Sequence, residues 1–149
     1  MRFFLISALL FAFSGKGFAF DHSDRASLAA ELQRLEADLE AGRFKEAAQR
    51  RAPRLGPWSE LPADIQLIEV SFDLDAVEIR TTITGVDYAV LPTTTVSSVG
   101  WGQHSTDTLL TFVFQQTGRW YFADLADDRD LERLLAAYPD FATIDFPNF

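Results

Sequence analysis

The sequence predicts an α+β domain in which N-terminal helices pack on an antiparallel sheet of four or five strands, with a short helix near the C-terminus. Apolar residues recur at helical spacing over residues 28–39 and alternate with polar residues over 66–83. A tight-turn signal at 117–118 then separates two β-rich stretches. Helices followed by a run of antiparallel strands are typical of the α+β class.

The N-terminal segment MRFFLISALLFAFSGKGFA has the layout of a secretory signal. Arg2 supplies the positive start, residues 3–13 form an apolar run, and small residues lead to a cleavage site after Ala19. The run is shorter than the about 20 apolar residues that a membrane-spanning helix needs. An uncleaved membrane anchor is the alternative. We therefore expect a periplasmic or secreted protein of residues 20–149, a single domain without stable membrane insertion.

Two helices are expected at the start of this domain. Gly42 stands where a left-handed residue ends a helix, and a shorter second helix should run from Phe44 to about Arg51 because Pro53 stops it. The first helix carries an apolar stripe whose members are spaced by four, three and four residues: Leu28, Leu32, Leu35 and Leu39.

Strands are expected from residue 66 onward. Residues 66–74 and 77–83 alternate between apolar and polar side chains, which is typical of a sheet with one exposed face. Thr84 and Gly85 give a turn signal, and a further strand should cover residues 88–99. Pro92 lies inside that strand and predicts an edge position or a bulge, since proline cannot donate to the ladder.

Residues 106–124 are expected to form a β-hairpin around Thr117 and Gly118. A two-residue loop pairs Phe114 with Tyr121, whereas a three-residue loop shifts every partner by one. Both faces are substantially apolar in either register. In the two-residue register one face holds the candidate residues of a homodimer interface: Leu109, Val113, Trp120 and Phe122.

The two apolar faces of this hairpin both need a cover. The leucine stripe of the first helix suits one of them, and the other must meet a ligand, a second subunit or the C-terminal tail. Asp127 and its acidic neighbours can cap a short helix that Pro139 ends. The remaining tail, DFATIDFPNF, is rich in aromatic residues and is a candidate cover.

The net charge of the chain limits the classes of partner that it can bind. Without Arg2 and Lys16 of the signal segment, 11 basic residues face 22 acidic ones, which excludes nucleic-acid binding as the main role. The absence of cysteine excludes disulfides and thiol catalysis. A local basic group is either a solvated helix face or a patch for an anionic partner: Arg43, Lys45, Arg50, Arg51 and Arg54.

Two stretches, LEAGRFKEAA at 39–48 and TFVFQQTGRWYFADL at 111–125, resemble the NTF2-like superfamily, a cone-shaped α+β fold that also houses ketosteroid isomerase. FDLDAVEIRT with YAVLPT, and YPDFATIDFP, are similar to small secreted proteobacterial proteins of that kind. The resemblance implies a curved antiparallel sheet around a pocket, and backs of such sheets often form dimers. Only residues 55–64, which contain Pro57 and Pro62, occupy the interval where a third helix usually closes the cone; if that helix is missing, the pocket would be open or collapsed.

No catalytic, cofactor or metal motif is present in the sequence. The candidate ligand-binding residues are Tyr88, Trp101 and His104, because the glycine-flanked loop at 100–102 can lean over a pocket mouth. The alternative is a loop that only covers the end of the sheet.

Three functions follow from these observations. The first is an exported, non-catalytic module that binds a small apolar molecule or an envelope protein. The second is an isomerase-like or hydratase-like enzyme with a carboxylate and a tyrosine in an apolar pocket, for which Asp124, Tyr121 and Tyr88 are the candidates. The third is a structural homodimer formed through the hairpin face.

Overall fold

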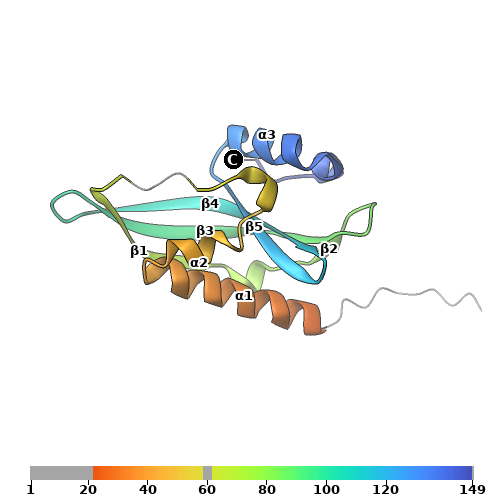
Figure 1. Cartoon of the computed structure of the whole chain (residues 1–149), viewed down its shortest axis with the longest axis horizontal. Coiled ribbons are helices and arrows are strands. Elements are labelled where there is room, and N and C mark those ends of the chain that lie inside the picture. The colour runs from red at the N-terminus through yellow and green to blue at the C-terminus, as the bar shows by residue number, and fades with distance from the viewer. Residues whose placement is uncertain (1–21, 59–61, 149) are drawn as a thin grey trace, which may run out of the picture.

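The computed structural model describes residues 22–58 and 62–148, and the expected signal segment lies outside them. A curled antiparallel sheet forms the middle layer, with α1 (His22–Glu40) and α2 (Phe44–Ala48) on one face and α3 (Asp128–Ala137) on the other (Figure 1). The strands are β1 (Ile65–Phe72), β2 (Arg80–Thr81), β3 (Asp87–Val99), β4 (Gln103–Gln116) and β5 (Arg119–Leu125). The predicted α+β class is therefore confirmed.

The strand order is β1-β3-β4-β5, and β2 pairs with the first residues of β3. Tight turns join β3 to β4 and β4 to β5, so β3 and β4 form one extended hairpin, whereas β2 and a 3₁₀ turn at Leu74–Ala76 lie between β1 and β3. The described residues between α2 and β1, which leave out 59–61, contain a 3₁₀ turn at Pro53–Leu55 and no α-helix.

The expectation that Pro92 marks an edge position or a bulge is wrong, because β3 has neighbours on both sides and its register with β4 continues unbroken through Pro92 opposite Leu110. The Pro92 carbonyl accepts a hydrogen bond from the backbone N–H of Asp73 at 3.1 Å, so the proline nitrogen faces that same side of β3. There β1 has ended at Phe72, and β2 begins only opposite Tyr88. The proline thus lies just past the last β1–β3 pair, Phe72 opposite Thr93, where its missing N–H coincides with the end of the ladder.

The second alternating stretch also differs from its prediction. Only Arg80–Thr81 pairs with β3, although Val77 and Ile79 are buried in the core beneath α1. Ile83 points into solvent beside the predicted turn at Gly85, whose φ is +87°. The alternation of apolar and polar residues in this stretch therefore indicates which side chains are buried, but it does not predict how many residues pair with β3.

The layer beneath α1 forms as the leucine stripe predicted. Leu28, Leu32 and Leu35 are buried against the sheet, and Gly42 ends the helix region with a φ of +70°. The second helix ends three residues before the predicted Arg51, because the chain from Arg50 to Ala52 runs parallel to β5. The N–H of Ala52 donates to the carbonyl of Phe122 at 2.7 Å, and this segment covers the outer edge of β5.

The β4–β5 hairpin adopts the two-residue register. Thr117 and Gly118 have φ values of +53° and +75°, which is the left-handed pair of a type I′ turn. Phe114 pairs with Tyr121, so alternate side chains divide between the two faces as that register predicts.

The C-terminal tail covers the second face of the hairpin. Asp127 caps α3 by accepting from the backbone N–H groups of Arg129 and Asp130, at 2.9 and 3.1 Å. The rings of Phe141 and Phe146 lie 4.9 and 5.4 Å from the ring of Phe112, between centroids. Among the three covers considered for this face, the tail is the one that occupies it.

Candidate functional site

The three residues expected to bind a ligand do not meet. Tyr88 pairs with Phe114 at one end of β3, within the aromatic layer beneath the tail. His104 pairs with Ser98 near the other end, about 30 Å away at roughly 3.3 Å per residue. Trp101 is fully exposed in the turn beyond His104. The glycine-flanked turn therefore projects away from Tyr88 and closes no pocket with it.

The four interface candidates lie on the face of β4 and β5 that α1 covers. Val113, Trp120 and Phe122 are at most 2% exposed in the core beneath the helix. Leu109 lies further along β4 and is half-buried. Three of these four side chains are therefore already buried within the single chain and offer no surface to a second subunit.

The candidate acid–base residues are divided between the two faces. Asp124 points away from Tyr88 and Tyr121 and accepts a hydrogen bond from Nε1 of Trp58 at 2.9 Å. Burial raises the pKa of Asp124, while the Trp58 hydrogen bond and the charge of Arg51 oppose the shift. The carboxyl is thus held by its own fold and has no tyrosine partner for the proposed chemistry.

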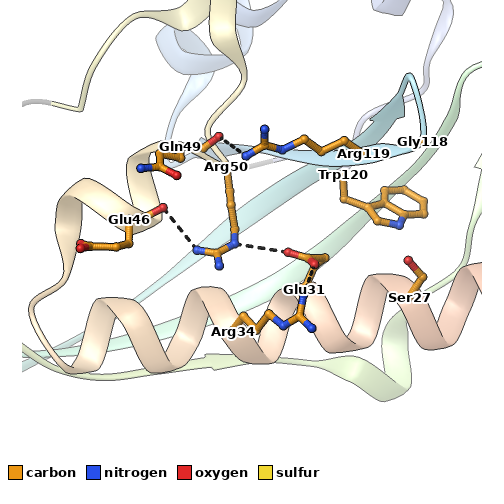
Figure 2. Close-up of a pocket in the computed structure, with 9 residues that line it drawn as sticks. All are labelled: Ser27, Glu31, Arg34, Glu46, Gln49, Arg50, Gly118, Arg119 and Trp120. Atoms are coloured by element: carbon orange, nitrogen blue, oxygen red, sulfur yellow. Dashed lines mark hydrogen bonds and ion pairs between the residues drawn. The ribbon is translucent and has the colours of Figure 1, made fainter.

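A polar cleft of about 250 Å³ lies between α1, α2 and the β4–β5 turn (Figure 2). It was not anticipated from the sequence, because its walls come from three segments that are distant along the chain. The lining residues are Ser27, Glu31 and Arg34 of α1, Glu46, Gln49 and Arg50 at α2, and Gly118, Arg119 and Trp120 at the turn.

Local geometry explains why these side chains converge. Ser27, Glu31 and Arg34 are spaced by four and three residues, so they form a polar stripe on α1 beside the leucine stripe. The type I′ turn places Arg119 and Trp120 at the start of β5, with their side chains on opposite sides of the strand. Arg119 reaches over and donates to the carbonyl of Gln49 at 3.1 Å.

An ion-pair network fixes one side of the cleft. Glu31 accepts from Arg34 at 2.6 Å through Oε1 and from Arg50 at 3.3 Å through Oε2. Arg50 also donates to Asp38 at 2.6 Å, and Arg43 donates to Asp38 at 2.8 Å. Hydrogen bonds from Arg43 and Arg50 hold the pKa of Asp38 below its usual range. Both oxygens of Glu31 are consequently occupied by the protein itself.

The basic group between residues 43 and 54 is not one surface. Arg43 and Arg50 belong to the network beside the cleft, whereas Arg54 lies on the α3 side of the sheet. Its guanidinium donates to the carbonyl of Ala137 at 3.1 Å and stacks over the ring of Tyr138. Only a part of the group could therefore face an anionic ligand.

An unused donor lies in a residue that lines the cleft. Trp120 is 2% exposed, and its Nε1 has no hydrogen-bond partner among the described residues. Buried polar groups are nearly always paired, so this N–H stands out. Figure 2 shows the indole reaching from β5 toward α1 with its nitrogen on the side of Ser27. The arrangement can hold a ligand that offers acceptor oxygens.

In comparisons with known proteins, no family model, curated protein or solved structure matches the chain. Within residues 22–58 and 62–148, no helix is both long and apolar enough to cross a membrane. No group of three potential metal ligands gathers in that part of the chain either.

Proposed function

We propose that the protein is an exported, non-catalytic binding module with an NTF2-like architecture, and that its ligand lies in the cleft between α1, α2 and the β4–β5 turn. The observation that carries this proposal is the buried Nε1 of Trp120, which has no partner in the described chain and adjoins a cleft lined with hydrogen-bond donors. A bound acceptor would satisfy the group that the fold leaves unpaired.

Binding is favoured over catalysis by where the titratable groups lie. Asp124 is covered by Trp58 on one face, and the two candidate tyrosines belong to the aromatic layer on the other. A general acid must reach the reacting atom within hydrogen-bond distance. The cleft instead offers arginines, a hydroxyl and an indole N–H, which orient a ligand without exchanging protons near neutral pH.

Export is part of the proposal, since the layout of residues 1–19 is that of a cleavable signal. Expression in a bacterium followed by cell fractionation and N-terminal sequencing tests it. We expect the mature chain in the periplasm or medium with Phe20 as its first residue. Recovery of the intact chain from the cytoplasm would contradict export.

Native mass spectrometry of the mature chain, purified from the periplasm, tests the binding function. We expect a monomer that carries additional mass, and loss of that mass in Trp120→Phe, which keeps an aromatic ring but removes the N–H. Arg129→Gln on exposed α3 is the matched control and should keep the added mass. A bare homodimer would instead favour the structural alternative, and a bare monomer would contradict a retained ligand.

A further inference from the structure

The donors of the cleft outnumber its free acceptors. The two oxygens of Glu31 already accept from Arg34 and Arg50, and these ion pairs balance the charge of Glu31 within the protein. Of the acidic side chains that line the cleft, this leaves Glu46 free of an ion pair. The donors comprise the Ser27 hydroxyl, the Trp120 N–H and the arginine N–H groups that the internal bonds do not use. A ligand with several acceptor atoms would pair with these donors, whereas a cation would not.

The charge of the lining has the sign opposite to that of the whole chain. Three arginines and two glutamates line the cleft, whereas the complete sequence has a net charge of −9. Arg34 is well exposed, with 64% of its side chain accessible, and its pair with Glu31 uses Nη1 and leaves other N–H groups for a ligand. Guanidinium groups bind planar carboxylates through pairs of parallel hydrogen bonds, so a local excess of them favours a carboxylate ligand.

The cleft is also small. Its volume of about 250 Å³ lies below the roughly 300–1,000 Å³ of pockets for drug-sized ligands. Its walls are charged and polar side chains, apart from the ring of Trp120. A long apolar molecule would find little surface to cover here, which separates this cleft from the apolar pocket expected at the sequence level.

Resting on the proposed binding function, we propose that the cleft takes a small organic anion through its carboxylate. Arg34 and Arg119 supply the charged donors, and Nε1 of Trp120 supplies a neutral donor in a buried position. Arg50 is held in place by Glu31 and Asp38 and keeps the wall rigid. This donor set prefers a carboxylate to its uncharged amide, because charged hydrogen bonds are about twice as strong as neutral ones.

The test is titration of the exported protein with sodium succinate, using calorimetry and tryptophan fluorescence. Trp101→Phe removes the fully exposed indole from the fluorescence signal without touching the cleft. We expect saturable binding of succinate with a change in the remaining emission, and at least tenfold weaker binding of succinamide, the uncharged analogue. Equal binding of succinamide, or tighter binding of inorganic phosphate, would overturn the carboxylate assignment.

Variants then locate the binding site. Arg119→Gln should weaken succinate at least tenfold, while Arg129→Gln, which removes an equal charge from exposed α3, should leave the affinity unchanged. Trp120→Phe should weaken binding several-fold and lower thermal stability only by the cost of a smaller buried ring, since the lost N–H has no partner among the described residues. Equal effects of Arg119→Gln and Arg129→Gln would show that only overall charge matters and would refute the site.

The two proposals fail in different ways. If purified protein carries a bound mass but succinate, citrate and acetate do not compete with it, the carboxylate inference is wrong and the binding module stands. If the protein carries no mass and binds none of these anions up to about 10 mM, both are wrong.

Discussion

Two halves of a single strand, β4, differ sharply in what covers them. Residues 103–108, QHSTDT, are almost all exposed, whereas residues 111–114, within LLTFVF, are completely buried. Both halves pair with β3 in one uninterrupted register, from Gln103 opposite Val99 to Phe114 opposite Tyr88. Figure 1 shows the first half projecting beyond the helices and the second half enclosed between α1 and α3.

The comparison separates what forms a strand from what stabilises a fold. The backbone ladder is the same along β4, so hydrogen bonding does not distinguish the projecting half from the covered half. Burial does, since each large apolar side chain removed from water contributes about 1.5–3 kcal/mol. Most of the free energy of unfolding should therefore reside in the covered half, and the projecting half should be stable only because its ladder continues from there.

The largest effect should come from Phe112→Ala in the covered half. Phe112 is fully buried, and its ring contacts those of Tyr88, Phe114, Phe141 and Phe146. Loss of the ring should reduce the free energy of unfolding by about 3–5 kcal/mol in urea titrations, because a cavity remains where three elements meet.

Thr106→Ala is the matched control for this variant, on the same strand and the same face but in the projecting half. It should change stability by less than about 0.5 kcal/mol. If the two variants cost similar amounts, stability is spread along β4 and the division into halves is false.

A medium effect is expected at the boundary between the halves. The hydroxyls of Thr93 and Thr111 are buried and lie 2.7 Å apart. Thr111→Val should cost about 1–3 kcal/mol, because it leaves the Thr93 hydroxyl buried without its partner. Adding Thr93→Val should recover most of that loss in a double-mutant cycle. Additive costs for the two substitutions would show that water, and not the partner hydroxyl, satisfies each threonine.

Local signals in the sequence were sufficient for the covered half. The turn at Thr117 and Gly118 limited the hairpin to two registers, of which the structure adopts the two-residue one, and the leucine spacing of α1 identified its buried face. Composition alone also distinguishes QHSTDT from LLTFVF. These features depend on residues a few positions apart, which is the range over which periodicity is informative.

Features that depend on distant segments could not be predicted in the same way. The cleft joins residues near 30, 48 and 119, and no spacing rule connects them. Pro92 was misread because the gap beside β3 exists only through the endpoints of β1 and β2. Tyr88 and Trp101 were grouped because the glycine-flanked turn was expected to lean over a pocket mouth, yet the length of β3 keeps them apart.

Two carboxylates extend the comparison to pH. Asp124, on β5 opposite Thr111 of the covered half, is desolvated, which raises its pKa, so the folded chain keeps a proton that the unfolded chain releases near pH 4. Its contribution to stability therefore declines as pH rises from about 4 through the folded pKa. Asp124→Asn should gain stability relative to the parent between pH 4 and 7, by up to about 1.4 kcal/mol for each unit of pKa separation.

Asp38 should show the opposite trend. Its arginine partners lower its pKa, so its contribution is present above about pH 4 and is lost as pH falls through the folded value. Asp38→Asn should be less stable than the parent at pH 7, with the deficit shrinking toward pH 2–3. Urea titrations across this range measure both variants, and parallel pH profiles would contradict the environments assigned to the two groups.

The smallest effect should come from Trp101→Ala at the tip of the projecting half. The indole is fully exposed, and the tip is shaped by its backbone: Gly100 and Gly102 adopt φ values of +58° and +83°, and the N–H of Gly100 donates to the carbonyl of Asp64 at 3.0 Å. Removal of the side chain should change the free energy of unfolding by less than about 0.5 kcal/mol. The tryptophan fluorescence of the variant should also be quenched less by acrylamide, because its most accessible tryptophan is gone. A cost above about 1 kcal/mol would mean that the indole packs in solution, and the projecting half would then have a core of its own.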